Sequence, residues 1–183
     1  MKGQYKNIHE KLIKACKKGD RKAQFELYKQ YSKAMYNTSF RILKDSAEAE
    51  DAMQDGFLKA FQNIDTYSGT VSFGAWLKRI IVNTSLDALR KRKVEFEDIS
   101  ELNLKIPEEE TSEDEEELNL KIEKVKEAML LLPDGYRVVL SLYLLEGYDH
   151  DEIAEIMNVS SSTSRSQLAR ARKKLLELLE SNK

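Results

Sequence analysis

The chain has 183 residues, of which 41% are hydrophobic and 34% charged, with 7 glycines and 2 prolines. This composition is typical of a soluble, strongly helical protein, and the length allows one domain or two small ones. No run of about 18 apolar residues predicts a membrane span, and no apolar segment at the N-terminus predicts a signal peptide. A single cysteine, Cys16, excludes an internal disulfide and suits a reducing compartment, so we expect a cytoplasmic protein.

The two histidines, His9 and His150, lie far apart in the sequence and lack the spacing of metal ligands. No phosphate-cradling glycine loop and no nucleophile elbow is present either. We therefore expect no metal, no cofactor and no catalytic residue. The formal net charge is −2, whereas a free-standing DNA-binding protein usually carries net positive charge. Any DNA contact must then depend on local basic patches or on a partner.

Apolar spacing predicts helices over 5–18 and 21–43, separated by Gly19 and Asp20. Cys16 lies in phase with the apolar positions of the first helix, which predicts a buried structural thiol. In the second helix, the regularly spaced apolar residues are expected in the core: Phe25, Tyr28, Tyr31, Met35 and Ile42.

Asp45 begins a third helix that is expected to run to about residue 63, with Glu48 at the position that completes a capping box. Its apolar face would carry Ala49, Met53, Phe57, Ala60 and Phe61. Its polar face would carry Asp51, Gln54, Asp55 and Gln62, and an apolar residue, Leu58, lies among them. A leucine in a polar stripe indicates either a partner surface or one of the scattered apolar residues that are common on protein surfaces.

Residues 65–70 are expected to form a loop, and Ser72 to begin a long helix that ends in the basic run 90–93. Apolar side chains on two flanks of this helix indicate a central position in the domain. Between the flanks runs a polar row that is poor core material: Trp76, Arg79, Asn83, Asp87 and Arg90. An indole, an amide and two guanidiniums are well suited to the bases and phosphates of a single strand.

Residues 95–117 contain twelve acidic residues against one lysine, and include a proline. This composition predicts a flexible acidic linker over 94–119, which joins a first small helical domain, 1–93, to a second, 120–183. The linker is either a plain spacer or an anionic segment that occupies a positively charged channel.

In the second domain, helices are expected over 118–132, 136–145 and 150–157. The last of these is short, and its buried set would be Ile153, Ala154, Ile156 and Met157. A serine-rich turn follows, in which Ser160, Ser161 or Ser162 can cap the next helix.

That next helix extends to about residue 179, with one apolar face and one cationic, hydroxylic face. A short helix, a tight turn and a longer basic helix make a helix-turn-helix, whose second helix lies in the DNA major groove. The side chains expected at base edges and phosphates are Thr163, Arg165, Ser166, Gln167, Arg170 and Lys173. The alternative is a solvated basic face on an ordinary bundle helix.

In this order, the segments resemble the extracytoplasmic-function (ECF) subfamily of bacterial RNA polymerase sigma-70 factors, which contain only sigma regions 2 and 4. Residues 49–65 (AEDAMQDGFLKAFQNID) resemble the helix that docks on the polymerase clamp. Residues 65–93 resemble the segment that opens and reads the −10 element. Residues 131–175 resemble region 4, which reads the −35 element. The resemblance implies an all-α fold and a promoter-recognition subunit that catalyses nothing itself.

The resemblance also implies roles for single residues. Polymerase contacts match Asp51, Gln54, Asp55 and Leu58. For the −10 element, Tyr67 matches the aromatic of a loop that holds a flipped-out base, and Asn83 matches an asparagine that contacts the non-template strand. With the polar row and the basic end of the helix, the expected −10 contacts are Tyr67, Trp76, Arg79, Asn83, Arg90, Lys91 and Arg92.

In region 4, Arg165, Ser166 and Arg170 match groove-facing positions of the family. Gln167 and Ala169 depart from its usual residues, and suit adenine and the thymine methyl group respectively. The resemblance also favours the channel hypothesis for the acidic linker. Expected partners are the RNA polymerase core, through its clamp and flap, promoter DNA and an anti-sigma factor; neither membrane insertion nor a small-molecule substrate is expected.

The sequence thus predicts a sigma factor that directs promoter recognition, DNA melting at −10 and transcription initiation of a specialised regulon. One alternative is a conventional helix-turn-helix regulator with an N-terminal sensing or dimerisation domain, which leaves Leu58 and the polar row unexplained. Another is an enzyme that uses Asp51 and Asp55, one helical turn apart, as a carboxylate pair. That hypothesis is weak because no His, Cys or Lys base shares their face.

Overall fold

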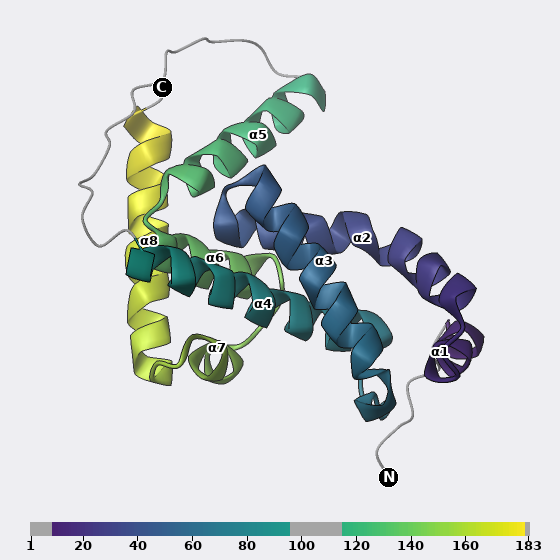
Figure 1. Cartoon of the computed structure of the whole chain (residues 1–183). Coiled ribbons are helices and arrows are strands. Elements are labelled where there is room, and N and C mark those ends of the chain that lie inside the picture. The colour runs from purple at the N-terminus through teal and green to yellow at the C-terminus, as the bar shows by residue number, and fades with distance from the viewer. Residues whose placement is uncertain (1–8, 96–114, 182–183) are drawn as a thin grey trace. The chain divides into compact units, whose positions relative to one another are not determined.

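The computed structural model describes residues 9–95 and 115–181, with side chains over 9–92 and 122–181 (Figure 1). The chain divides into two compact units, Met1–Glu95 and Phe96–Lys183. The described parts contain eight α-helices and one short 3-10 helix, which confirms the all-α expectation for them. Within these ranges, no helix has both the length and the apolar character needed to cross a membrane.

The first unit contains α1 (Glu10–Lys17), α2 (Arg21–Leu43), α3 (Ser46–Gln62), η1 (Ile64–Thr66) and α4 (Phe73–Glu95). Helices α2, α3 and α4 pack against one another, while α1 lies against α2 and η1 (Figure 1). The bounds expected for the second helix are confirmed. The expected loop over 65–70 is wrong at its start, because η1 turns there: the Thr66 hydroxyl and its backbone N–H both donate to the Asn63 carbonyl.

The core of the first unit lies between α2, α3 and α4, where Leu27, Leu77 and Ile81 are fully buried. Helices α3 and α4 approach closely at Gly56, where a Cβ atom would overlap the Ile81 side chain. A larger residue at this position would therefore displace the end of the Ile81 side chain. Cys16 also belongs to this core, as its helical phase predicts.

One expected core residue of α2 lies outside the core. Met35 and Ile42 are buried and Tyr28 and Tyr31 are half-buried, but Phe25 is 59% exposed. Burial at this turn falls instead on two other residues, Ala23 and Leu27. Because each of these is two positions from Phe25, they lie about 200° from it around the helix axis. The neighbouring elements decided which of the two sides faces inward.

Aspartate residues cap two helices of the first unit, α2 and α3. Asp20 caps α2 by accepting from the Lys22 and Ala23 N–H groups, and Asp45 caps α3 by accepting from the Glu48 N–H at 2.9 Å. The expected capping box at α3 is half formed, since the Glu48 carboxylate pairs with Arg92 of α4 at 3.1 Å.

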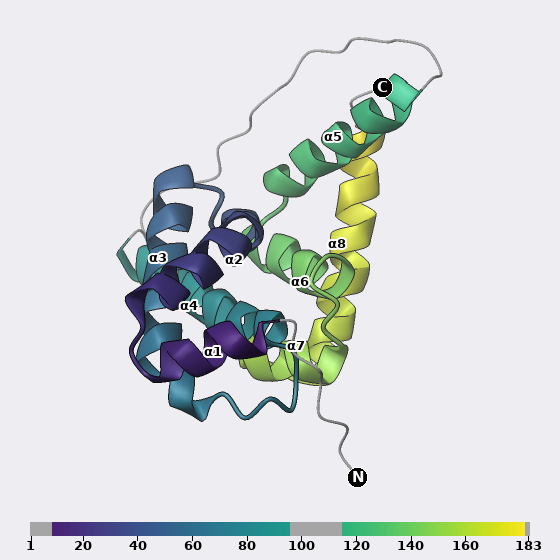
Figure 2. The same ribbon diagram turned by 90° about the vertical axis from the view of Figure 1, so that its right-hand side faces the viewer.

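The second unit contains α5 (Glu115–Leu131), α6 (Asp134–Leu144), α7 (His150–Met157) and α8 (Ser161–Ser181). Helix α8 packs against the other three, and Figure 2 shows α6 alongside it. The bounds of α7 are as expected. Helix α5 begins three residues earlier than expected, so residues 115–119 of the predicted linker are helical. Residues 96–114 of that linker lie outside the described residues.

The core of the second unit joins α6, α7 and α8 through Leu140, Ile153, Leu168 and other buried apolar residues. Arg137 is also buried in it, with only 1% of the residue exposed. Its guanidinium pairs with Asp134 at 2.7 Å and donates to the Leu132 carbonyl at 3.1 Å. This pairing stabilises the turn between α5 and α6, because a buried charge must be compensated. Met157, expected to be buried, is half-buried.

Candidate polymerase and nucleic-acid interfaces

The polar face of α3 is exposed as the sequence predicted. Asp51, Gln54, Asp55 and Leu58 follow one another at helical spacing, and Leu58 is 57% exposed. The Gln54 amide donates to the Glu50 carboxylate at 3.2 Å, within the same helix. The structure therefore brings the four predicted polymerase-binding residues together on one acidic surface with an apolar centre.

A groove of about 360 Å³ lies between the end of α3, η1 and α4. Two residues of the predicted polar row, Trp76 and Asn83, line it together. Lys59 of α3 reaches across and donates to the Thr84 hydroxyl at 3.3 Å. The lining residues are Lys59, Asn63, Thr66, Trp76, Ile80, Asn83, Thr84 and Asp87. Sequence reasoning missed Lys59, Asn63 and Thr66, because they lie outside α4; their polar character at the end of α3 was the available signal.

The other cations predicted on α4 differ in their surroundings. Arg79 is half-buried, Lys91 is exposed, and the exposed Arg90 pairs with Asp87 at 3.1 Å. Arg92 is engaged inside the unit: it pairs with Glu48 and donates to the Leu43 carbonyl, both at 3.1 Å. The Arg92 guanidinium thus ties the end of α4 to the α2–α3 turn in the free protein, and its contact with DNA stays a prediction.

Tyr67 is a core residue, with only 6% of its surface exposed. Its hydroxyl donates to the Val71 carbonyl at 2.7 Å, and its ring packs edge-on against Phe73. Lys17 of α1 donates to the Tyr67 carbonyl at 2.9 Å. The ring is therefore buried in the free protein, and its contact with a base stays a prediction. Tyr67 braces the loop, whose exposed apolar side chain is Val71.

Two titratable groups in the first unit are kept neutral by their environment. Burial raises the pKa of the Cys16 thiol, and the nearby Asp20 carboxylate raises it further. Burial also raises the pKa of the Tyr31 hydroxyl, with a smaller contribution from Tyr67. Neither group is placed for acid–base chemistry. The described residues contain no cluster of three or more His, Cys, Asp or Glu side chains that could hold a metal ion.

The helix-turn-helix is fixed by caps on both of its helices. Asp149 and Glu152 form a full capping box at the start of α7. Helix α7 ends at Asn158, which adopts a left-handed conformation with φ 57°, and the Ser160 hydroxyl accepts from the Thr163 N–H at the start of α8. The serine-rich turn is thus a capped turn between two helices, as the sequence predicted.

Helix α8 has the two faces that its sequence predicted. Leu168 and Ala171 are buried, whereas four of the predicted DNA contacts are exposed: Arg165, Ser166, Arg170 and Lys173. Thr163 is half-buried and shares a hydrogen bond of 2.8 Å with Ser160.

Gln167 departs from the expected exposed position. It is half-buried, and its Oε1 atom is enclosed without a hydrogen-bond partner among the described residues. Its amide is therefore turned partly inward in this structure.

Three residues that sequence reasoning missed, Tyr143, His150 and Arg172, connect α8 to α6 and α7. The Arg172 guanidinium lies 5.6 Å from the centre of the Tyr143 ring, and that ring stacks on His150 at 4.8 Å. These contacts join α6, the start of α7 and the middle of α8. An aromatic residue in α6 and the histidine at the start of α7 were the available signals.

Comparison with known proteins identifies both units. Residues 27–95 match the family description Sigma-70 region 2, and residues 122–175 match Sigma-70, region 4. The ECF RNA polymerase sigma factor SigW of Bacillus subtilis is 30% identical over 178 residues, which cover 92% of this chain and 95% of that protein. The ECF sigma factor SigM of Mycobacterium tuberculosis is 27% identical, over 97% of this chain and 87% of that protein.

Two solved structures have a similar fold. The structure of CnrH in complex with the cytosolic domain of CnrY gives a TM-score of 0.58 at 23% identity, over 94% of this chain and 97% of that chain. RpoE from Bartonella quintana, solved with the anti-sigma factor NepR, gives a TM-score of 0.60 at 24% identity, over 86% of this chain and 97% of that chain. At these identities the likeness concerns the fold.

An all-α protein with an exposed acidic face in one unit and a helix-turn-helix in the other has the organisation of a sigma-70 factor reduced to regions 2 and 4. The conventional-regulator hypothesis assigned the N-terminal half to sensing or dimerisation, and that half matches region 2 instead. The chain belongs to the ECF subfamily of RNA polymerase sigma-70 factors.

Proposed function

We propose that this sigma factor binds the RNA polymerase core through the polar face of α3, opens and reads the −10 element along α4, and inserts α8 into the major groove at −35. It would thereby direct transcription initiation at the promoters of a specialised regulon, in the cytoplasm where template and polymerase meet. The observation that carries the proposal is the combination, in one chain, of the α3 face, the α4 groove and the exposed cationic face of α8. The polymerase supplies the catalytic groups.

The polar face of α3 suits a protein partner with basic residues around an apolar contact. Leu58 offers an apolar centre, while Asp51 and Asp55 on the same face provide the negative charge that orients the encounter. We assign the polymerase clamp to this surface, with Gln54 as an additional hydrogen-bonding contact.

The groove along α4 suits an unpaired base of the −10 element. The Trp76 indole can stack on a base, the Asn83 amide can bond its edge, and the Lys59 ammonium can contact a phosphate. Arg79, Arg90 and Lys91 extend the basic character along the helix. Arg92 can join them only if it leaves its contacts with Glu48 and the Leu43 carbonyl. Tyr67 contributes by holding the loop in shape.

The exposed face of α8 suits a duplex at −35. Arg165 and Arg170 can each bind a guanine through its O6 and N7 atoms, and Ser166 and Thr163 can contact bases or phosphates. Lys173 lies further along the helix, where a backbone contact is expected. Gln167 can reach an adenine only if its amide turns outward from the position seen here.

One further partner and one further polymerase contact follow from this function. CnrH and RpoE were solved with CnrY and the anti-sigma factor NepR respectively, and we propose that an anti-sigma factor also controls this chain. We propose that the acidic segment 95–117 enters a positively charged channel of the polymerase; this proposal rests on its charge.

Run-off transcription with bacterial core polymerase on a library of promoter fragments tests this function. Specific transcripts are expected only when the protein is added. They should disappear with Asp55→Ala, which weakens core binding, and with Asn83→Ala, which leaves core binding intact. An absence of transcripts together with tight duplex binding by the protein alone would contradict the proposal and favour a conventional regulator.

A further inference from the structure

An aromatic ring on α2 is exposed among cations, outside every surface discussed so far. Phe25 is 59% exposed, and its exposed neighbours on the helix include Arg21, Lys22 and Lys29. By helix geometry, these four residues fall within an arc of about 100° on one side of α2. The Lys29 ammonium lies 5.1 Å from the centre of the Phe25 ring. We call these four residues the Phe25 stripe.

The Phe25 ring is not needed to pack α2 against the core. Ala23 and Leu27 anchor this turn of α2 in the core, and an exposed phenylalanine forgoes the favourable free energy of burying its ring. A single exposed apolar residue is common on protein surfaces. Here, however, an exposed ring with three cations on the same side of one helix has the composition of a platform for stacked, negatively charged ligands.

The surroundings of the stripe are strongly basic. Residues 10–33 contain eight lysines and arginines against three acidic residues, a net charge of +5 in a chain whose total is −2. The three acids are already engaged: Glu10 pairs with Lys14, Asp20 caps α2, and Glu26 pairs with Lys29. Their charges are therefore partly compensated locally, and a polyanion is the complementary ligand.

This basic region contacts the loop that precedes α4. Helix α1 contacts η1, and its Lys17 donates to the Tyr67 carbonyl at 2.9 Å. Lys18 and Arg21 follow at the turn into α2, and Phe25 lies one helical turn beyond Arg21. A strand that leaves the groove along α4 therefore finds cations along the chain from the loop to the stripe.

We propose that the Phe25 stripe is a second contact for single-stranded DNA, in which a base stacks on Phe25 and Lys22 and Lys29 bind the adjoining phosphates. The assignment of this strand to promoter DNA rests on the proposed sigma function. When a base arrives, the long Lys29 side chain leaves the ring and its exposed ion pair with Glu26 and moves to a phosphate, so that the ring face is freed. The contact is tolerant of sequence, because every base has an aromatic face.

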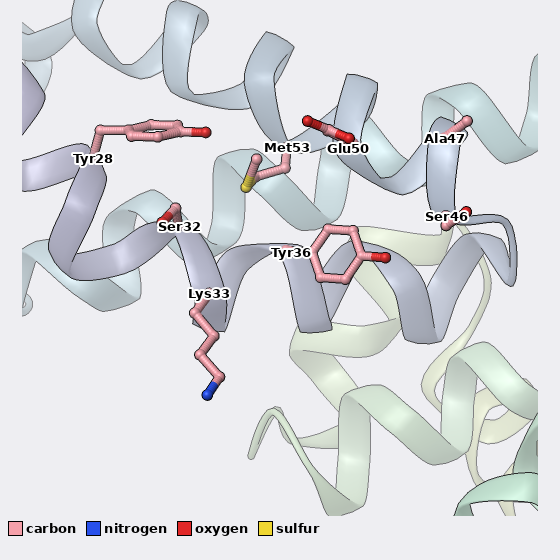
Figure 3. Close-up of a pocket in the computed structure, with 8 residues that line it drawn as sticks. All are labelled: Tyr28, Ser32, Lys33, Tyr36, Ser46, Ala47, Glu50 and Met53. Atoms are coloured by element: carbon pink, nitrogen blue, oxygen red, sulfur yellow. The ribbon is translucent and has the colours of Figure 1, made fainter.

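The basic region ends at Lys33, beside a groove between α2 and α3. This groove has a volume of about 490 Å³, and Figure 3 shows Lys33 directed away from it while Glu50 of α3 stands on its opposite side. The groove is lined by Tyr28, Ser32, Lys33, Tyr36, Ser46, Ala47, Glu50 and Met53. The Glu50 carboxylate disfavours phosphates inside this groove, so we place the strand along the stripe and not within the groove.

The test measures binding of the full chain to a fluorescent oligothymidine of about 15 nucleotides at low salt, by anisotropy. Because stacking contributes at least about 1 kcal/mol per base, Phe25→Ala should weaken binding about fivefold or more. Phe25→Trp should restore it. Lys22→Gln and Lys29→Gln should each lower the salt slope by about 0.7, the value for one phosphate on a single strand.

Leu144→Ala is the matched control, since Leu144 is 50% exposed at the end of α6, in the second unit, and its loss should leave oligothymidine binding unchanged. Equal melting temperatures of the variants would show that they fold alike. Three outcomes would overturn the inference: no oligothymidine binding by the wild-type chain at low salt, unchanged binding by Phe25→Ala, or displacement of the DNA by a polyglutamate peptide whose own binding also needs Phe25. The last outcome would assign the stripe to an acidic protein.

Failure of this inference can be told apart from failure of the sigma function. Promoter-specific run-off transcripts together with unchanged oligothymidine binding by Phe25→Ala would contradict only the inference about the Phe25 stripe and would leave the sigma function standing. Oligothymidine binding that depends on Phe25, without any polymerase-dependent transcript, would remove only the assignment of the bound strand to promoter DNA.

Discussion

The His150 ring of α7 lies against the Ser164 side chain of α8, with Nδ1 2.9 Å from Oγ. Ser164 is fully buried, and the half-buried His150 ring stacks on Tyr143 of α6. A buried hydroxyl needs a hydrogen-bond partner. This contact therefore helps to fix the angle between the two helices of the helix-turn-helix, on which the proposed insertion of Arg165 and Arg170 into a major groove depends.

We expect His150→Ala to destabilise the second unit by about 1–3 kcal/mol, because it leaves the Ser164 hydroxyl buried without its partner. Ser164→Ala should cost less, and the double variant should cost less than the sum of the two. Chemical denaturation of the four proteins measures the coupling. Strict additivity would show that the hydrogen bond does not contribute. Use of the −35 element should weaken with His150→Ala while binding to core polymerase stays unchanged.

Leu58→Ala should weaken binding to core polymerase by about tenfold, which corresponds to about 1.4 kcal/mol. The stability of the free protein should not change, because Leu58 is exposed. Competition with a labelled sigma factor for core polymerase measures the affinity. Phe25→Ala removes a side chain of similar exposure and serves as the control. Equal losses of core affinity in the two variants would contradict the assignment of the α3 face.

Tyr67→Phe distinguishes two roles of the Tyr67 hydroxyl: stabilising the loop before α4, or contacting a base of the DNA. Loss of the hydrogen bond to the Val71 carbonyl should cost about 1 kcal/mol of stability, measured by denaturation. Promoter melting, followed by permanganate reactivity of unpaired thymines, should persist at temperatures where the variant is folded. A loss of melting without a loss of stability would instead show that the Tyr67 hydroxyl reaches the DNA in the open complex.

Cys16 should react slowly with iodoacetamide in the folded protein near pH 8, and rapidly once it is unfolded. Burial raises the pKa of this thiol, so folding favours its neutral form. The resulting contribution to stability is intact below the pKa of the unfolded thiol, about 8.5, and is lost progressively as the pH rises above it. Denaturation at pH 7 and pH 10 should show a larger loss of stability for the wild type than for Cys16→Ala. Equal losses would show that the thiol is not responsible.

The sequence by itself determined most of the local structure. The bounds of α2 and α7 follow from signals next to the helices: Asp20 before one, Asp149 and Glu152 at the start of the other. The faces of α3 and α8 also follow from periodicity, since a side chain's angle around a helix depends only on its position in the sequence. The exposure of Leu58 and Arg170 was predictable for that reason.

Only the tertiary structure decided which distant groups meet. Phe25 lies outside the core because Ala23 and Leu27, on the other side of α2, face the packed helices. Arg92 is tied to Glu48, and Tyr67 is closed into the core by Phe73 and Trp76. Periodicity gives the phase of one helix, but not the orientation of its neighbours. Whether an arginine or an aromatic ring between helices is buried or paired depends on which partners lie within a few ångströms. Only the packing of the helices determines those partners.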